Sequence, residues 1–262
     1  MKTVYQGASV CYGTGSGHPE AEARTIVFIH GGGFDHSVWV MPARFFARHG
    51  FRVIAPDLPA HGSSEGAALT SIDAMADWVA GLLRQEAPGP AVIAGHSMGS
   101  LVAMQMASQY TDLVERVVLL GTAAPMPVGP PLLHAAEDNH HAAIDMANTW
   151  SHSNRGSLGA SEVPGVSNLN SGERLLERMP EGAYYADLAA CNAFDAHMDL
   201  ADIPVLVIAG GDDRMTPARS GLKVAGSLAQ AETVLLHGCG HSMLSEQPNE
   251  VLDALADFIL ER

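Results

Sequence analysis

The chain has 262 residues, of which 47% are apolar and 16% are charged, and its formal net charge is −15 at pH 7. Such an acidic surface disfavours nucleic acid and anionic membranes as partners, because both require clustered Lys and Arg. No apolar run approaches the roughly 20 residues that cross a bilayer, and the N-terminus lacks the apolar segment of a signal peptide. The three cysteines form no disulfide framework, and the 13 histidines include no H-E-x-x-H spacing. We therefore expect a reduced, cytoplasmic protein with no metal site and no cofactor.

The first part of the chain alternates between predicted strands and predicted helices. Strands are indicated by short apolar runs, and helices by apolar residues that recur at helical spacing. In chain order we expect a hairpin or edge strands at 4–12, a loop at 13–24, strands at 25–29, 52–56, 91–94 and 114–120, and helices at 39–49, 71–86 and 100–107. Gly50 stands where a helix C-cap is expected. Strands that read as continuous apolar runs between helices indicate a parallel sheet covered on both faces.

The pattern changes between residues 125 and 201, where no strand signal is found. We predict helical pieces at 132–150, 172–179 and 183–195, broken by loops around Arg155, Gly156, Gly159, Pro164 and Gly165. Strands at 205–209 and 233–236 and helices at 217–228 and 249–260 then resume the alternation. The predicted domain organisation is an α/β core of residues 1–124 and 202–262, with residues 125–201 inserted as a helical cap. Ligands of open parallel sheets bind outside the carboxyl ends of the strands, so the cap is expected to close over that edge.

One stretch, Gly95-His96-Ser97-Met98-Gly99, lies between a predicted buried strand and a predicted helix. A G-x-S-x-G sequence in this context is typical of a nucleophile elbow, a sharp turn that projects the serine hydroxyl from the end of the sheet. The glycines supply room, because a Cβ at either position would clash with the neighbouring strand or helix. The N–H groups and the dipole of the helix face whatever the serine attacks.

A serine hydroxyl needs a base within hydrogen-bond reach, and the base needs a group that orients it. Two later loops follow strands at the same predicted sheet edge. The first contains Asp212 and Asp213, and the second runs from His237 to His241. The chain order is therefore Ser, Asp, His, as expected for a hydrolase built on this topology.

These motifs resemble those of the α/β-hydrolase superfamily, in its capped branch of esterase-like and C–C-hydrolase-like members. The matching segments, in the family's order and each at a strand end, are His30-Gly31-Gly32-Gly33, Asp57-Leu58-Pro59-Ala60-His61-Gly62-Ser63-Ser64, Gly95 to Gly99, Gly210-x-x-Asp213-x-x-x-Pro217 and Gly240-His241. The resemblance implies an α/β-hydrolase fold, a mostly parallel twisted sheet with helices on both faces and an inserted helical cap.

We assign Ser97 as the nucleophile, His241 as the general base and later the general acid, and Asp213 as the residue that orients His241. Asp212 is the rival acid, but the spacing to Pro217 in the family pattern favours Asp213. The oxyanion hole is predicted from the N–H groups of Met98 and Gly32, with Gly33 as the neighbouring alternative to Gly32.

Several other residues near these motifs are given structural roles. His30, His61 and His96 are expected to support the site from behind, His237 to end its strand, and Cys239 to pack as a small hydrophobe rather than act as a nucleophile. For the substrate pocket we predict an apolar wall. Its candidate residues are Gly33, Phe34, Met98, Met126, Trp150, Met215 and Met243, with His152, Tyr184, Tyr185 and Asn192 of the cap as further candidates.

Ser97 excludes the epoxide hydrolases and haloalkane dehalogenases of the superfamily, which carry Asp at the elbow. The first hypothesis is a hydrolase of a small carboxylic ester, lactone or thioester that forms an acyl-enzyme. The alternatives are a C–C hydrolase of a diketone-like compound, a cofactor-free perhydrolase, and a ligand receptor that does not turn over. We expect a small-molecule substrate as the partner. The sequence leaves the oligomeric state open, a homodimer included.

Overall fold

The computed structural model describes residues 1–159, 167–195, 200 and 203–260. Its strands form one sheet in the order β1-β2-β4-β3-β5-β6-β7-β8. The first two strands form an antiparallel hairpin, β2 pairs antiparallel with β4, and all later pairings are parallel. The strands are β1 (Lys2–Tyr5), β2 (Ala8–Gly13), β3 (Thr25–Ile29), β4 (Arg52–Pro56), β5 (Ala91–His96), β6 (Val114–Leu120), β7 (Val205–Gly210) and β8 (Ala231–Leu236).

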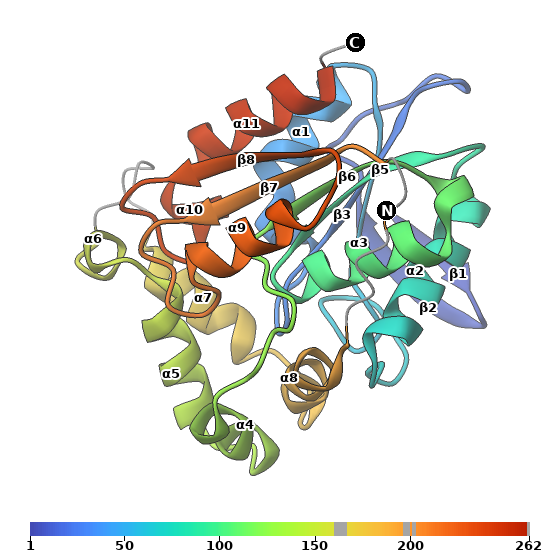
Figure 1. Ribbon diagram of the computed structural model, residues 1–262. Coiled ribbons are helices and arrows are strands. Elements are labelled where there is room, and N and C mark those ends of the chain that lie inside the picture. The colour runs from blue at the N-terminus through green and yellow to red at the C-terminus, as the bar shows by residue number, and fades with distance from the viewer. Residues whose placement is uncertain (160–166, 196–199, 201–202, 261–262) are drawn as a thin grey trace.

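Helices cover both faces of this sheet, as Figure 1 shows. One face carries α1 (Val40–Arg48) and α11 (Pro248–Leu260), and the other carries α2 (Ile72–Glu86), α3 (Met98–Gln109) and α9 (Ala218–Gly226). Short helices η1 (His36–Trp39), η2 (Thr111–Leu113) and α10 (Met243–Glu246) lie in connections. Among the residues described, no helix combines the length and the apolar character needed to cross a membrane.

The central strands are buried because their side chains alternate between two apolar layers. In β3, Ile26 and Phe28 pack in the layer with α1 and α11, whereas Val27 and Ile29 pack in the layer with α2 and α3. A strand side chain points to opposite faces at successive positions, so a strand covered on both sides must be apolar throughout. This explains why the continuous apolar runs correctly predicted a parallel sheet with two covered faces.

A helical insertion lies between β6 and β7, and its helices gather at one end of the molecule in Figure 1. They are α4 (Pro130–Glu137), α5 (Ala142–Ser151), α6 (Asn154–Ser157), α7 (Asn168–Leu176) and α8 (Ala183–Ala193). The insertion has an apolar cluster of its own, with Leu132, Ala147, Leu176 and Leu188 among its buried members. Its helices therefore pack on one another as well as on the sheet domain.

Three predictions within the insertion need correction. The predicted helix at 132–150 is two helices, because Asn139 adopts φ 50° after α4. This left-handed conformation ends a helix, and asparagine tolerates it better than most residues. The loop predicted around Arg155 contains the one-turn helix α6, whose first turn is capped by the Ser153 hydroxyl accepting from the Gly156 N–H. Helix α7 begins four residues before the predicted start. The loop positions Pro164 and Gly165 lie outside the described residues.

Candidate active site

Ser97 occupies the turn between β5 and α3, in a conformation that non-glycine residues rarely adopt. Its φ is 55° and its ψ is −119°. A Cβ at Gly95 would lie 1.9 Å from the carbonyl oxygen of Gly99, and a Cβ at Gly99 would lie 2.3 Å from that of Ile29. The turn thus requires glycine on both sides of the serine. Strained φ/ψ values of this kind cost about 1 to 3 kcal/mol and cluster at functional sites.

His241 and Asp213 come from the loops after β8 and β7 and form a buried pair. The His241 Nδ1 lies 2.8 Å from the Asp213 Oδ2, and both side chains are almost inaccessible to solvent. A carboxylate accepts hydrogen bonds, so Nδ1 carries the proton and Nε2 keeps its lone pair when the ring is neutral. This is the tautomer that a general base requires.

Thr216 completes the surroundings of Asp213, and sequence reasoning did not identify it. Its hydroxyl donates to Asp213 Oδ2 at 2.8 Å, and its backbone N–H donates to Oδ1 at 2.7 Å, as does the Met215 N–H at 2.8 Å. Burial by itself raises the pKa of Asp213, but the interaction with His241 and these hydrogen bonds outweigh it and hold the pKa of Asp213 below its ordinary value. Asp213 is therefore a stable carboxylate at neutral pH.

His96 holds the loop that carries His241 through a hydrogen bond to its backbone. The His96 Nε2 donates to the His241 carbonyl oxygen at 2.9 Å, and the two rings lie 4.8 Å apart between centroids. Burial and the neighbouring His241 lower the pKa of His96 to about 3. His96 thus stays neutral and acts as a structural donor, in agreement with its predicted supporting position.

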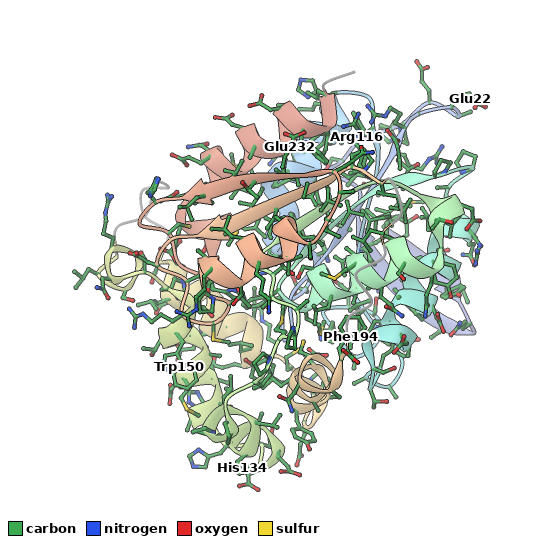
Figure 2. All side chains as sticks on the ribbon, viewed as in Figure 1. Glu22, Arg116, His134, Trp150, Phe194 and Glu232 are labelled. Carbon is green, nitrogen blue, oxygen red and sulfur yellow. The ribbon has the colours of Figure 1, made fainter. Side chains whose placement is uncertain are left out.

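Ser97 and His241 line the same cavity, which has a volume of about 250 Å³. Most of its wall is apolar and comes from both the sheet domain and the helical insertion. Of the predicted residues, those that line it are Gly32, Phe34, Ser97, Met98, Met126, Trp150, Met215 and His241, together with Tyr184. Trp150 lies near the end of α5, on the insertion (Figure 2).

Two residues predicted for the pocket, Gly33 and Met243, do not line this cavity. The Gly33 N–H donates to Asp187 Oδ2 at 2.8 Å, and a Cβ at Gly33 would lie 2.4 Å from Leu176 Cδ2. Met243 is fully buried in the apolar layer between the sheet and helices α1 and α11. It begins the short helix α10, whose turn directs it into the core although it lies only two residues after His241.

The other candidates of the insertion are placed as follows. His152 lines a neighbouring apolar cavity that shares Phe34, Gly172 and Ser242 with the first. Tyr185 lies at another surface hollow, with its hydroxyl donating to Glu137, and the Asn192 side chain accepts from the Val128 N–H. None of these three lines the cavity that contains Ser97.

The rival groups in the catalytic loops are poorly placed for chemistry. Asp212 is exposed, and its N–H donates to the Cys239 carbonyl oxygen. Cys239 is fully buried, and burial raises the pKa of its thiol well above the ordinary value. A thiol that stays protonated is a poor nucleophile. The structure therefore brings Asp213, rather than Asp212, to His241.

Two backbone N–H groups are candidates for binding a developing negative charge. Met98 is the first residue of α3, where N–H groups have no acceptor inside the helix. In the loop after β3, the Gly33 and Phe34 N–H groups are used by Asp187 and Gly31. The Gly32 N–H has no hydrogen-bond acceptor among the described residues, and Gly32 lines the cavity.

A parallel sheet that places a serine elbow and a His–Asp pair on one cavity has the architecture of an α/β hydrolase. Residues 26–254 match the alpha/beta hydrolase family, and the chain belongs to this family.

Individual relatives agree with this assignment. The pimeloyl-[acyl-carrier protein] methyl ester esterase of Aromatoleum aromaticum is 29% identical over 249 residues, which cover 89% of this chain and 97% of the esterase. Protein ABHD8 of Bos taurus is 27% identical over 245 residues, which are 90% of this chain, so the chain spans about half (56%) of that relative. The crystal structure of an enol-lactonase from Burkholderia xenovorans LB400 has the same fold, with a TM-score of 0.86, 24% identity and full coverage of both chains.

Proposed function

We propose that the protein is a serine hydrolase that cleaves a small carboxylic ester, lactone or thioester through an acyl-enzyme on Ser97. The observation that carries this proposal is the buried Asp213–His241 pair, which opens onto the same cavity as the strained Ser97. The esterase and lactonase activities in the names of the relatives support it. A binding protein would need neither an oriented base nor a strained serine.

In the proposed reaction, His241 Nε2 takes the proton of the Ser97 hydroxyl as the Ser97 oxygen attacks the carbonyl carbon of the substrate. The negative charge that forms on the carbonyl oxygen is stabilised by the N–H groups of Met98 and Gly32. His241 then gives its proton to the leaving oxygen or sulfur, which departs and leaves the acyl group on Ser97. Water, deprotonated by His241, attacks the acyl carbon, and the carboxylic acid is released with Ser97 reprotonated.

The substrate class follows from the size and polarity of the cavity. About 250 Å³ accommodates a small acyl and leaving group, and Met98, Met126 and Met215 provide an adaptable apolar wall. We assign the helical insertion the role of a cap, since Trp150 of α5 and Tyr184 of α8 line the cavity that contains Ser97. Residues of the insertion would then select among substrates.

The test is hydrolysis of p-nitrophenyl acetate and p-nitrophenyl butyrate by the intact chain and by Ser97→Ala. We expect a burst of p-nitrophenol equal to the enzyme concentration, followed by steady turnover. Loss of Ser97 should lower kcat by about 10⁴- to 10⁶-fold. Ser227→Ala is the matched control, because Ser227 is exposed and its hydroxyl donates to the Val224 carbonyl oxygen of the preceding turn. The control should turn over like the intact chain, and turnover at that level in Ser97→Ala would refute the proposal.

A further inference from the structure

A second buried histidine–aspartate pair, His61 with Asp187, joins the sheet domain to the helical insertion. His61 lies in the loop after β4, and Asp187 lies in α8, 126 residues later. The His61 Nε2 is 2.8 Å from Asp187 Oδ2, and both side chains are almost completely buried. Nothing in the proposed reaction uses either side chain directly, yet Asp187 lines the cavity that contains Ser97.

The hydrogen-bond partners of His61 define its protonation state. Its Nε2 faces the Asp187 carboxylate and its Nδ1 lies 3.0 Å from the Pro59 carbonyl oxygen. Both partners are acceptors when Asp187 is ionised, so both ring nitrogens then carry a proton and the ring is an imidazolium. Burial lowers the pKa of His61, but the charge and hydrogen bond of Asp187 outweigh this and raise the pKa of His61 above its ordinary value.

The neighbouring His30 shows the opposite arrangement. Its Nδ1 donates to the Gly31 carbonyl oxygen at 2.8 Å, and its Nε2 accepts from the Leu58 N–H at 3.1 Å. One donor and one acceptor nitrogen describe a neutral ring. Burial and the nearby His61 lower the pKa of His30 to about 4. Of two rings whose centroids are 4.8 Å apart, only His61 therefore carries a charge.

Asp187 connects this charge to the loop that supplies the Gly32 N–H. Its Oδ2 also accepts from the Gly33 N–H at 2.8 Å, and a Cβ at Gly32 would lie 3.2 Å from the Asp187 Cβ. The side chain of Asp187 therefore packs directly against Gly32 and Gly33, which restricts the rotation of the peptide groups there. With Gly33 bound to Asp187, the Gly32 N–H is left for the cavity.

A carboxylate at this position also has an electrostatic cost. An uncompensated negative charge beside the oxyanion hole would oppose the negative charge of the transition state, and interactions of this kind are strong in a water-excluded site. The His61 imidazolium cancels it at a distance of 2.8 Å. The loop is thus held by a carboxylate whose charge is balanced locally.

We propose that His61 and Asp187 are positioning residues, and that their imidazolium–carboxylate pair fixes the Gly32–Gly33 loop for oxyanion binding while neutralising the carboxylate beside it. This inference rests on the proposed serine hydrolase function and deepens it. It assigns the helical insertion a part in catalysis besides substrate selection, because the negative half of the pair comes from α8.

Charge balance is tested by a double-mutant cycle with His61→Gln and Asp187→Asn. His61→Gln leaves the carboxylate uncompensated, and we expect kcat for p-nitrophenyl butyrate to fall by about 100-fold, with KM changed less than threefold. Asp187→Asn keeps an amide oxygen for Gly33 and His61 and should lose less than tenfold. The double variant removes both charges, so its kcat should exceed that of His61→Gln by at least about tenfold. Asp145→Asn, which breaks the exposed His141–Asp145 pair of α5, is the matched control.

The pH profile provides a readout that a purely structural role would not move. The charged or titratable groups that face His61 are Asp187 from α8, His30 after β3, and Asp57 in its own loop; Tyr184 and Cys191 lie beside Asp187. The kcat of the native chain should fall at alkaline pH as His61 loses its proton. In Asp187→Asn, His61 lacks its counter-charge, so this alkaline decline should move to lower pH.

The outcomes separate the two proposals. If kcat of His61→Gln stays within twofold of the native value while Ser97→Ala is inactive, the positioning role is refuted and the hydrolase function stands. The positioning role is also refuted if the histidine NMR signals show that His61 is neutral at pH 7. The same spectra report whether the variants remain folded. If Ser97→Ala retains activity, the hydrolase function fails, and the positioning role fails with it.

Discussion

The two buried histidine–aspartate pairs, His61–Asp187 and His241–Asp213, differ in the contacts of the histidine nitrogen that faces away from the carboxylate. In both pairs a ring nitrogen lies 2.8 Å from a carboxylate oxygen. His61 also places its other nitrogen on the Pro59 carbonyl oxygen. The His241 Nε2, in contrast, has no hydrogen-bond partner among the described residues, and His241 lines the cavity with Ser97. A histidine whose nitrogens both donate to acceptors is held as an imidazolium, whereas one with a free nitrogen can move a proton.

The two carboxylates also differ in where their hydrogen-bond donors come from in the chain. Asp213 accepts from two backbone N–H groups and the Thr216 hydroxyl, all within its own loop. Asp187 accepts from a loop that lies far away in the chain, and its Oδ1 has no hydrogen-bond partner within the described part of the chain. Asp213 is therefore preorganised by local sequence, while the position of Asp187 depends on how the insertion packs on the sheet domain.

The largest expected effect is that of Asp213→Asn, which removes the charge of the side chain but keeps its shape. The amide can donate to His241 Nδ1 and so favour the tautomer that has its proton on Nε2, where it cannot act as a base. We expect kcat to fall by about 10⁴-fold with the fold retained. Asp212→Asn is the control and should change kcat by less than twofold. Equal losses in the two variants would contradict the assignment of Asp213.

The second test concerns stability, measured by urea unfolding. Asp187→Ala leaves His61 buried without its partner, and removing one member of a buried pair costs about 3 to 5 kcal/mol. The pKa of His61 is raised in the folded state. The stabilisation from its protonation is thus complete below the unfolded pKa of about 6.5 and is lost as pH rises through the folded value.

The free energy of unfolding of the native chain and that of Asp187→Ala should therefore converge as pH rises above neutral. Circular dichroism at each pH would measure both. If the difference between the two free energies of unfolding stayed constant across this pH range, the interaction of His61 with Asp187 would not depend on the protonation of His61.

The smallest expected effect is that of Thr216→Val, which removes a hydroxyl but retains the volume and the backbone N–H groups. Asp213 Oδ2 loses one donor, so the pKa of Asp213 should rise toward its ordinary value and kcat should fall by about tenfold or less. Since the folded pKa is depressed, the stability that Asp213 contributes is lost as pH falls through that pKa. Acid unfolding should therefore begin at a higher pH in Thr216→Val. Unchanged kcat and acid unfolding would show that the hydroxyl has no role in the pair.

Sequence reasoning succeeded where the signal is local. The strands around Ile26 and Val92 are continuous apolar runs because both sheet faces are covered, and the glycines beside Ser97 are required by close backbone contacts. The positions of Asp213 and His241 after the last two strands followed from parallel topology, since the carboxyl ends of parallel strands meet at one edge. The roles assigned to the three residues await the experiments above.

The same reasoning failed where a side chain's direction depends on packing. Phe34, Met98, Met126 and Met215, which flank the motifs, line the cavity as predicted. Met243 does not, and nothing near His241 in the sequence indicates that it turns into the core. Thr216 was overlooked because a single threonine in a polar loop has no periodicity to reveal it. Its hydroxyl becomes recognisable only beside Asp213.

The α/β alternation, the serine elbow and the order of the candidate catalytic groups can be predicted from the amino-acid sequence, because hydrophobic periodicity and glycine sterics act over a few residues. The contact of Asp187 in α8 with His61 and the Gly33 N–H is visible only in the folded chain. That contact depends on the docking of an inserted helix onto a sheet edge, and the docking is set by the summed packing of residues more than a hundred positions apart.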